Sequence, residues 1–172
     1  MLAMHPDLEI IPVRGNIQTR INKIVSENLD GLIVAKAALN RLKIDYPNMH
    51  IFSENQMLPA AAQGAIGIEI CNAQIQSEIL DILVKVNCSH TFTATKIERE
   101  IVAALEGTCL SPISALVTIQ DQKLHLQVRV SNQNGSTVIE REATFLPKQE
   151  SDALLQFKIE LLADGAKELI QT

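Results

Sequence analysis

The most constraining feature of this sequence is the stretch Lys123–Ser131, in which polar and apolar side chains alternate. Leu124, Leu126, Val128 and Val130 fall on one face of such a stretch, because successive side chains of a β-strand point to opposite sides. The period of two therefore predicts a strand with one face packed on a core and the other face polar. A fold that contains it has to supply neighbouring strands and an apolar cover.

Strand-like runs lie on both sides of this stretch, at Ser114–Ile119 and Thr137–Leu146. The turn-like connections, Asp121-Gln122 and Asn132–Ser136, favour an antiparallel three-stranded meander. Amphipathic helices that could cover its apolar face are predicted before and after it. They are about Thr91–Leu105, with Gly107 as the C′ residue, and about Ser151–Ile170. Residues 87–172 are thus expected to form a small α+β domain, a three-stranded antiparallel sheet covered by helices.

Residues 1–86 follow a different order, in which short apolar runs alternate with amphipathic stretches. This order predicts α/β architecture with a largely parallel sheet. The expected strands are 8–13, 32–35, 50–53 and 65–71, and the expected helices are 16–26 with Asn16 as N-cap, 37–42 and 74–86. Four strands are few for a doubly wound lobe, so we expect 1–86 to be a partial lobe. The domain boundary is placed near residues 86–90.

Composition narrows the class of protein. Hydrophobic residues make up 47% and aromatic residues 3%, and the net charge is −5. An acidic chain with few stacking rings is a poor nucleic-acid platform. No segment approaches the roughly 20 apolar residues that span a bilayer, and the N-terminus lacks the basic region of a signal peptide. Three cysteines without paired spacing argue against a disulfide framework, and we expect a cytoplasmic protein.

The segment Arg14–Arg20 is a candidate anion site. It places an arginine before a glycine turn, a helix N-cap at Asn16, and a second arginine in the first helical turn. Unpaired N–H groups at a helix N-terminus favour anions, and guanidinium groups bind carboxylates or phosphates in a bidentate manner. The alternative is that Arg14 and Arg20 are solvated surface residues.

Cys109 is the candidate nucleophile, in a loop between a predicted helix and Pro112. A helix C-terminus does not lower a thiol pKa, so activation would need basic groups from elsewhere. The alternative is a small buried hydrophobic residue, and we interpret Cys71 and Cys88 as structural. The small residues of Leu58–Glu69 match no phosphate-loop motif. The four histidines are not at metal-ligand spacing, so no metal site is expected.

Taken together, several segments resemble the C-terminal half of the hydroxymethylbilane synthase (porphobilinogen deaminase) family, in order and over essentially the whole chain. The second-domain resemblance is carried by Pro6–Glu9, Arg14-Gly15-Asn16, Thr19-Arg20, Asp30–Ala35 and Leu39–Leu42. The segment Leu58–Glu69 resembles the return crossing between domains. Glu98-Arg99 and Leu105-Glu106-Gly107, with Cys109, Pro112 and Ile113, resemble the cofactor-attachment region of the third domain. Thr108 and Ser114 stand where the family usually has glycine.

The resemblance implies a partial lobe of the periplasmic-binding-protein type and a cofactor-attachment domain. It implies a transferase of tetrapyrrole and heme biosynthesis, which joins four porphobilinogen units onto a Cys-linked dipyrromethane primer and releases ammonia. Cys109 would carry the dipyrromethane. Arg14 and Arg20 would bind the carboxylates of cofactor and substrate, and Arg41 would bind those of the substrate.

The same resemblance implies that the family's catalytic Asp and an adjacent arginine pair lie outside this sequence. We therefore expect a chain that is inactive without a separate N-terminal lobe, and we assign it no catalytic residue. Its expected partners are porphobilinogen, pyrrole oligomers and that lobe, with no nucleic acid and no membrane. The alternative is a non-catalytic remnant or binding subunit that pairs with a separate N-terminal half.

Overall fold

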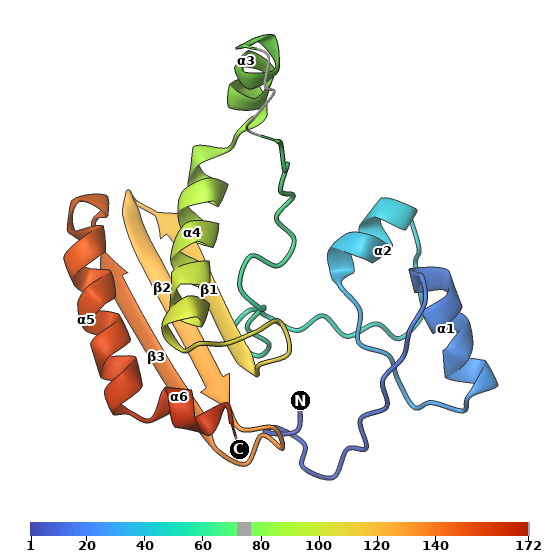
Figure 1. Cartoon of the computed structure of the whole chain (residues 1–172). Helices are drawn as coiled ribbons and strands as arrows, with labels where there is room; N and C mark the ends of the chain where they lie inside the picture. Colours follow the sequence, from blue (N-terminus) through green and yellow to red (C-terminus); the bar gives the residue numbers. More distant parts are fainter. Residues whose placement is uncertain (72–76, 172) are drawn as a thin grey trace. The chain divides into compact units, whose positions relative to one another are not determined.

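A computed structural model describes residues 1–71 and 77–171 (Figure 1). Contacts between residues divide the chain into two units. One consists of Met1–Pro6 with Glu54–Thr172, and the other of Asp7–Ser53. Each unit is described by itself below, and the boundary near residues 86–90 remains a prediction.

The predicted meander is confirmed. Strands β1 (Ile113–Gln120), β2 (Lys123–Ser131) and β3 (Val138–Phe145) form an antiparallel sheet in the order β1-β2-β3. Asp121 and Gln122 both have left-handed φ angles, 48° and 58°, as a two-residue hairpin turn of type I′ requires. The turn fixes the register, in which Gln120 lies opposite Lys123.

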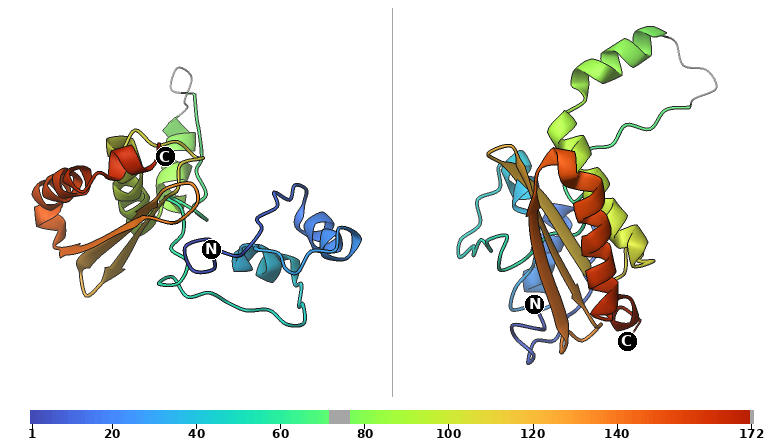
Figure 2. Two further views of the ribbon diagram at one scale, coloured as in Figure 1. Left: turned by 90° about the horizontal axis from the view of Figure 1, so that it is seen from below. Right: turned by 90° about the vertical axis from the view of Figure 1, so that its left-hand side faces the viewer.

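The core lies between one face of this sheet and the helices α4 (Ser89–Ala104) and α5 (Glu150–Ala163), which cover the same face (Figures 1 and 2). The alternation in β2 explains the arrangement, because its four apolar residues all point into the core while its polar residues face the other way. The largest of the fully buried side chains are Ile97, Ile101, Leu105, Leu124, Leu126, Val128, Val130 and Leu161.

The prediction of one continuous C-terminal helix is wrong. After the short 3₁₀ helix η2 (Pro147–Gln149), α5 ends at Ala163 and a separate helix, α6, spans Ala166–Leu169. Gly165 between them has a φ of 81°. Glycine adopts this left-handed conformation without steric cost and commonly ends helices for that reason.

Arg141 of β3 holds the end of α5 in place. Its Nη2 donates to Asp164 Oδ1 at 3.0 Å, its Nε donates to the other carboxylate oxygen, and Glu160 lies 3.5 Å from Nη1. The hydrogen bond from Arg141 lowers the pKa of Asp164 below its ordinary value. The carboxylate therefore contributes stability at pH values above its unfolded pKa, and that contribution is lost as the pH falls through the lower folded value.

We expect Asp164→Asn to destabilise the protein at neutral pH and to have a progressively smaller effect as the pH falls below the ordinary pKa of an aspartate, because the wild-type carboxylate then loses its charge as well. Urea unfolding of the two proteins across this range measures the difference. A destabilisation that stays constant down to the lowest pH would show that the ion pair is not its cause.

In the unit Asp7–Ser53, the helices α1 (Ile17–Ser26) and α2 (Lys36–Leu42) agree with the predicted ones. The strands expected at 8–13, 32–35 and 50–53 are absent, and so is the strand expected at 65–71 in the other unit. Apolar patterning specifies which side chains seek burial, but a strand also needs a neighbour for its backbone hydrogen bonds. No such neighbour is present in the described residues, and only Leu39 is buried in this unit.

The remaining helix, α3 (Ser77–Val86), agrees with the helix predicted at 74–86. Residues 74–76 of that prediction lie outside the described residues. Within the described part of the chain, no helix has both the length and the apolar character needed to cross a bilayer.

Candidate functional site

Cys109 lies in the turn between α4 and β1, and its side chain is exposed. The Ser111 N–H donates to the Thr108 carbonyl at 3.1 Å, and Ser111 Oγ accepts from the Thr108 N–H at 2.9 Å. The Thr108 hydroxyl accepts from the N–H of Leu110 at 3.2 Å. Thr108 thus helps to close the turn. The alternative of a buried Cys109 is wrong.

The chain reaches this turn through a Schellman motif at the end of α4. The Glu106 N–H donates to Ala103 O at 3.0 Å and the Gly107 N–H to Val102 O at 2.9 Å, the two hydrogen bonds that define the motif. Glu106, with a φ of 54°, is the C′ residue of the motif. The C′ residue was predicted at Gly107, so this prediction is wrong by one position. Gly107 is in close contact with Ile113, because a Cβ at position 107 would meet Cδ1 of that side chain and Ile113 would have to shift to admit it.

Glu98 of α4 binds the edge of β1 that does not pair with β2. Among the described residues, Glu98 is the one charged residue that is buried, with 5% of its surface exposed. Its carboxylate accepts from the Val117 N–H at 2.9 Å and from the Ala62 N–H at 2.7 Å. The Ala115 N–H, two residues along the same edge, donates to Pro59 O at 3.2 Å. Residues 59–62 therefore bind to β1 partly through the Glu98 carboxylate.

This role of Glu98 was not predicted from the sequence, although a signal was present. Ile97 and Ile101 lie on the apolar stripe of α4, and position 98 falls on the same face. A glutamate on a buried helix face needs polar partners from elsewhere in the fold. The partners themselves, 19 and 36 residues away, cannot be read from a helical period.

Arg14 precedes α1, and Arg20 lies in its first turn. Asn16 is the N-cap as predicted, and its Oδ1 accepts from the Thr19 N–H at 2.8 Å. Gly15 has a φ of 124°, a conformation that favours glycine. Arg20 Nε donates to the Gly15 carbonyl at 2.7 Å, which draws its guanidinium back toward the start of the helix. Arg14 is exposed.

The electrostatics of this helix end suit an anion. The first turn of α1 has no acidic residue, and the exposed helix N–H groups carry partial positive charge. Within the described residues, Arg14 makes no hydrogen bond or ion pair, and Arg20 uses only Nε. Both guanidinium groups therefore retain donors for a carboxylate.

Arg41 lies in the last turn of α2 and is exposed. Among the described residues, no hydrogen bond links it to Arg14 or Arg20. All three arginines belong to the unit Asp7–Ser53, and Cys109 belongs to the other unit.

Cys71 and Cys88, interpreted above as structural, are both exposed. Cys88 is the N-cap residue of α4, and Thr91 Oγ1 donates to its Sγ at 3.2 Å. This side-chain hydrogen bond, followed by the backbone N–H of Thr91, lowers the pKa of the Cys88 thiol. Stabilisation of a thiolate at a helix N-terminus is a general effect.

We expect iodoacetamide to alkylate Cys88 with a pH midpoint below that of an ordinary thiol, because the thiolate is the reactive form. Thr91→Val removes the hydroxyl at similar volume and should raise that midpoint. Peptide mapping of alkylation rates between pH 6 and about pH 10 measures both. An unchanged pH profile in the variant would exclude the hydroxyl as the cause.

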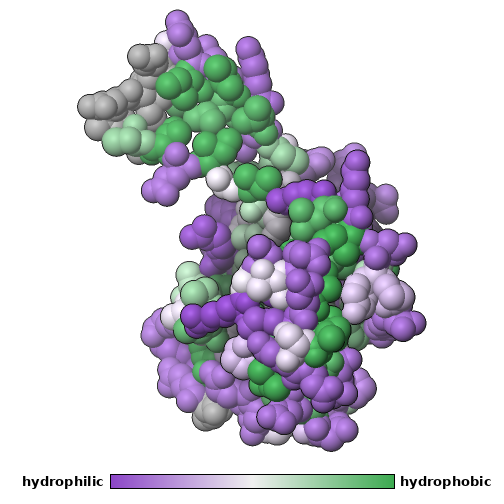
Figure 3. Space-filling view, turned by 90° about the vertical axis from the view of Figure 1, so that its right-hand side faces the viewer, coloured by the Kyte–Doolittle hydropathy of each residue, from purple (hydrophilic) through white to green (hydrophobic). Residues whose placement is uncertain are grey.

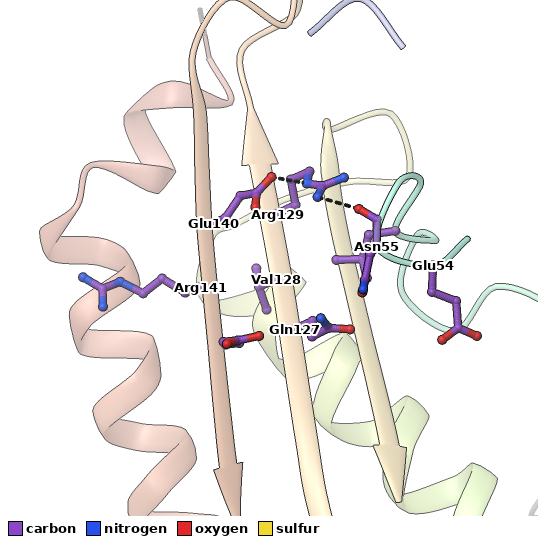
Figure 4. Close-up of a pocket in the computed structure, with 9 residues that line it drawn as sticks. Glu54, Asn55, Gln127, Val128, Arg129, Glu140 and Arg141 are labelled. Carbon is purple, nitrogen blue, oxygen red and sulfur yellow. Dashed lines mark hydrogen bonds and ion pairs between the residues drawn. The ribbon is translucent and has the colours of Figure 1, made fainter. Parts of the chain in front are cut away.

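A hollow of about 440 Å³ lies on the polar face of the sheet (Figure 4). Arg129 at this hollow has a partner for each guanidinium nitrogen: Nη1 and Nη2 donate to the carbonyls of Gln56 (3.3 Å) and Asn55 (3.1 Å), and Nε forms an ion pair with Glu140 at 2.6 Å. Arg141 points away from the hollow toward α5. Arg129 thus fastens residues 55–56 to β2, and none of the four site residues predicted from the sequence lines the hollow.

The described residues contain no group of three or more His, Cys, Asp or Glu side chains that could hold a metal ion. The exposed Cys109 thiol of one unit can form a thioether. In the unit Asp7–Ser53, the guanidinium groups of the candidate arginines can each recognise a carboxylate.

Comparison with known proteins matches two stretches of the chain to two domains of one family. Residues 1–78 match the family model described as "Porphobilinogen deaminase, dipyromethane cofactor binding domain", and residues 92–159 match "Porphobilinogen deaminase, C-terminal domain". The chain belongs to the porphobilinogen deaminase family. The first match contains all three candidate arginines, and the second contains Cys109.

Curated relatives named porphobilinogen deaminase are similar over nearly the whole chain. The protein of Neisseria meningitidis is 40% identical over 169 residues, which are 98% of this chain and 53% of the relative. Those of Maridesulfovibrio salexigens and Lawsonia intracellularis are 37% and 34% identical, over 99% of this chain and 54% and 55% of the relative. The chain thus spans about half the length of the relatives it matches.

Proposed function

We propose that this chain acts as the C-terminal half of a porphobilinogen deaminase (hydroxymethylbilane synthase), a transferase that joins four porphobilinogen units and releases ammonia. The observation that carries the proposal is the exposed Cys109 thiol, held in a closed turn within the region that matches the family's C-terminal domain. A buried cysteine could not take a substituent of this size, whereas an exposed one on a turn can.

Cys109 is proposed to hold the dipyrromethane cofactor through a thioether. Formation of this bond from porphobilinogen exchanges the C–N bond of the aminomethyl group for a C–S bond, and ammonia leaves with the thiol proton. When bound, the dipyrromethane supplies the primer to which pyrrole units are joined. Thr108 and Ser111 keep the turn that bears Cys109 closed.

Arg14 and Arg20 are proposed to bind carboxylates of the cofactor and of porphobilinogen, and Arg41 those of porphobilinogen. Acetate and propionate groups are the anions that bidentate guanidinium groups recognise. The match of residues 1–78 to the family's cofactor-binding domain supports this assignment. In the complete assembly, we propose that residues 1–71 contribute to a lobe with a largely parallel sheet.

The carboxylate that handles protons is proposed to come from a separate N-terminal lobe, so turnover requires that lobe. General acid–base catalysis needs a carboxylate within hydrogen-bond reach of the reacting atoms, and we assign none of this chain's carboxylates to that task. The alternative is a non-catalytic binding subunit. We propose that the chain functions in the cytoplasm.

Intact-mass spectrometry of the purified chain, before and after incubation with porphobilinogen, tests the proposal. We expect an adduct of dipyrromethane size that peptide mapping places on Cys109, in the presence of the N-terminal lobe. An unmodified thiol under all conditions would favour the binding subunit. Consumption of porphobilinogen by the chain alone would overturn the claim that the second lobe is needed.

A further inference from the structure

Hydrogen bonds of two side-chain hydroxyls reinforce the turn that carries Cys109. The Thr108 carbonyl accepts from the Ser111 N–H at 3.1 Å, the bond from residue i to residue i+3 of a β-turn, in which Cys109 and Leu110 are the central residues. Ser111 Oγ accepts from the Thr108 N–H at 2.9 Å, and Thr108 Oγ1 accepts from the Leu110 N–H at 3.2 Å. Many β-turns lack even the first of these bonds, so this turn is unusually well closed.

Both ends of the turn are joined to elements of the core. Before it, the Schellman motif ends α4, and Gly107 lies against the side chain of the buried Ile113. After it, the Ser111 carbonyl accepts from the Ile113 N–H at 2.7 Å. The Pro112 carbonyl then accepts from the N–H of Ser131, the last residue of β2, at 3.1 Å. The backbone on either side of the turn is therefore fixed.

The central residues of the turn are not held by burial. Cys109 is exposed, and Leu110 is exposed to 86%. The hydroxyl oxygens of Thr108 and Ser111 lie 3.5 Å apart, and their bonds to the backbone limit the conformations open to the two residues between them. A nucleophile that is held in one orientation reacts faster, because less orientational entropy is lost on the way to the transition state.

We propose that Thr108 and Ser111 are positioning residues, whose hydroxyls hold the Cys109 thiol in the orientation that thioether formation with porphobilinogen requires. This inference rests on the proposed function. Among the described residues, no hydrogen bond joins either hydroxyl to the thiol. The two hydroxyls therefore act on the thiol through the backbone of the turn, and their effect on its orientation can be measured without the reaction.

A nitroxide spin label on Cys109 measures the order of the turn directly. Replacing Cys71 and Cys88 by serine leaves Cys109 as the thiol to be labelled. We expect Ser111→Ala to narrow the electron paramagnetic resonance lines of the label, because the turn becomes more mobile. Ser111→Thr keeps the hydroxyl and should give the spectrum of the parent chain. Ser114→Ala, which removes a hydroxyl of β1 just beyond the turn, should also leave the spectrum unchanged.

These spectra are recorded at low micromolar concentration and again at a tenfold dilution. The reason is α3, which has no buried side chain and over which apolar residues gather (Figure 3). Exposed apolar surface favours self-association, and association would broaden the lines for a reason unrelated to the turn. Thermal unfolding of each variant checks that the core is intact.

The rate of adduct formation on Cys109 measures the consequence for the reaction. With porphobilinogen and the N-terminal lobe present, intact mass should show this rate falling by roughly tenfold in Ser111→Ala. Thr108→Val removes one hydrogen bond, and a loss of about threefold is expected. Ser111→Thr should restore the parent rate. Alkylation of Cys109 by iodoacetamide should change by less than about twofold, because this small reagent needs an exposed thiolate and no particular orientation.

An unchanged label spectrum in Ser111→Ala would overturn the proposal. So would a parent rate of adduct formation in spite of a narrowed spectrum. Equal slowing of adduct formation and of alkylation would also overturn it, because access to the thiol would then have changed in place of its orientation. If the spectrum narrows as expected but even the parent chain forms no adduct, the proposed function is contradicted, and the hydroxyls remain the groups that orient the thiol.

Discussion

Replacing Glu98 by alanine is expected to lower the free energy of unfolding by about 2–5 kcal/mol. The carboxylate is buried and accepts from the N–H groups of Val117 and Ala62. Its removal leaves two donors without an acceptor, and an unsatisfied buried donor costs about 1–3 kcal/mol. Urea or thermal unfolding of the full chain measures the loss. Amide exchange at Val117 and Ala62 should accelerate more than exchange in β3.

Two control variants separate this role from a general effect of charge. Glu98→Gln keeps one acceptor but turns an NH₂ toward the other N–H, so an intermediate loss is expected. Glu100→Ala removes another carboxylate of the same helix. The Glu100 carboxylate forms ion pairs with Lys96 and Lys158 at the surface, and surface ion pairs contribute about 1 kcal/mol or less to stability. Equal losses for Glu98→Ala and Glu100→Ala would contradict the proposed role of Glu98.

Cys109→Ser is expected to abolish the dipyrromethane adduct completely in the chain assembled with its second lobe. A serine hydroxyl is far less nucleophilic than a thiolate at neutral pH, and no second sulfur lies in the same turn. Intact mass and peptide mapping measure the adduct, and porphobilinogen consumption should be lost with it. The fold should persist because Cys109 is exposed.

The other two cysteines provide matched controls, because both are also exposed. Cys88 is the sharper one, since the Thr91 hydrogen bond lowers its pKa. If thiol acidity alone decided attachment, the adduct would form on Cys88. We expect Cys71→Ser and Cys88→Ser to keep the full adduct. An adduct that is lost with Cys88→Ser and kept with Cys109→Ser would overturn the assignment of Cys109.

The elements predicted well from the sequence are those that local patterns specify. The helix capped by Asn16 and the strand Lys123–Ser131 both form as predicted, because capping and hydrophobic period act between residues close in the chain. The strands expected at 8–13, 32–35, 50–53 and 65–71 are absent, since an apolar run does not carry its own hydrogen-bonding neighbour. A C-terminal helix was also predicted from its hydrophobic period, but its division into α5 and α6 at Gly165 was not predicted.

The sequence by itself determined the family, the meander with its covering helices, and the candidates Arg14, Arg20, Arg41 and Cys109, whose roles stay predictions. Only the tertiary structure decided that Glu98 binds residues 59–62 to β1, and that Gly107 lies against the Ile113 side chain. It also decided that α3 has an uncovered face. The reason is physical: hydrophobic period and capping depend on neighbours three or four residues away. Burial of a charge, exclusion of a Cβ and exposure of a helix depend on residues that the chain brings together only when it folds.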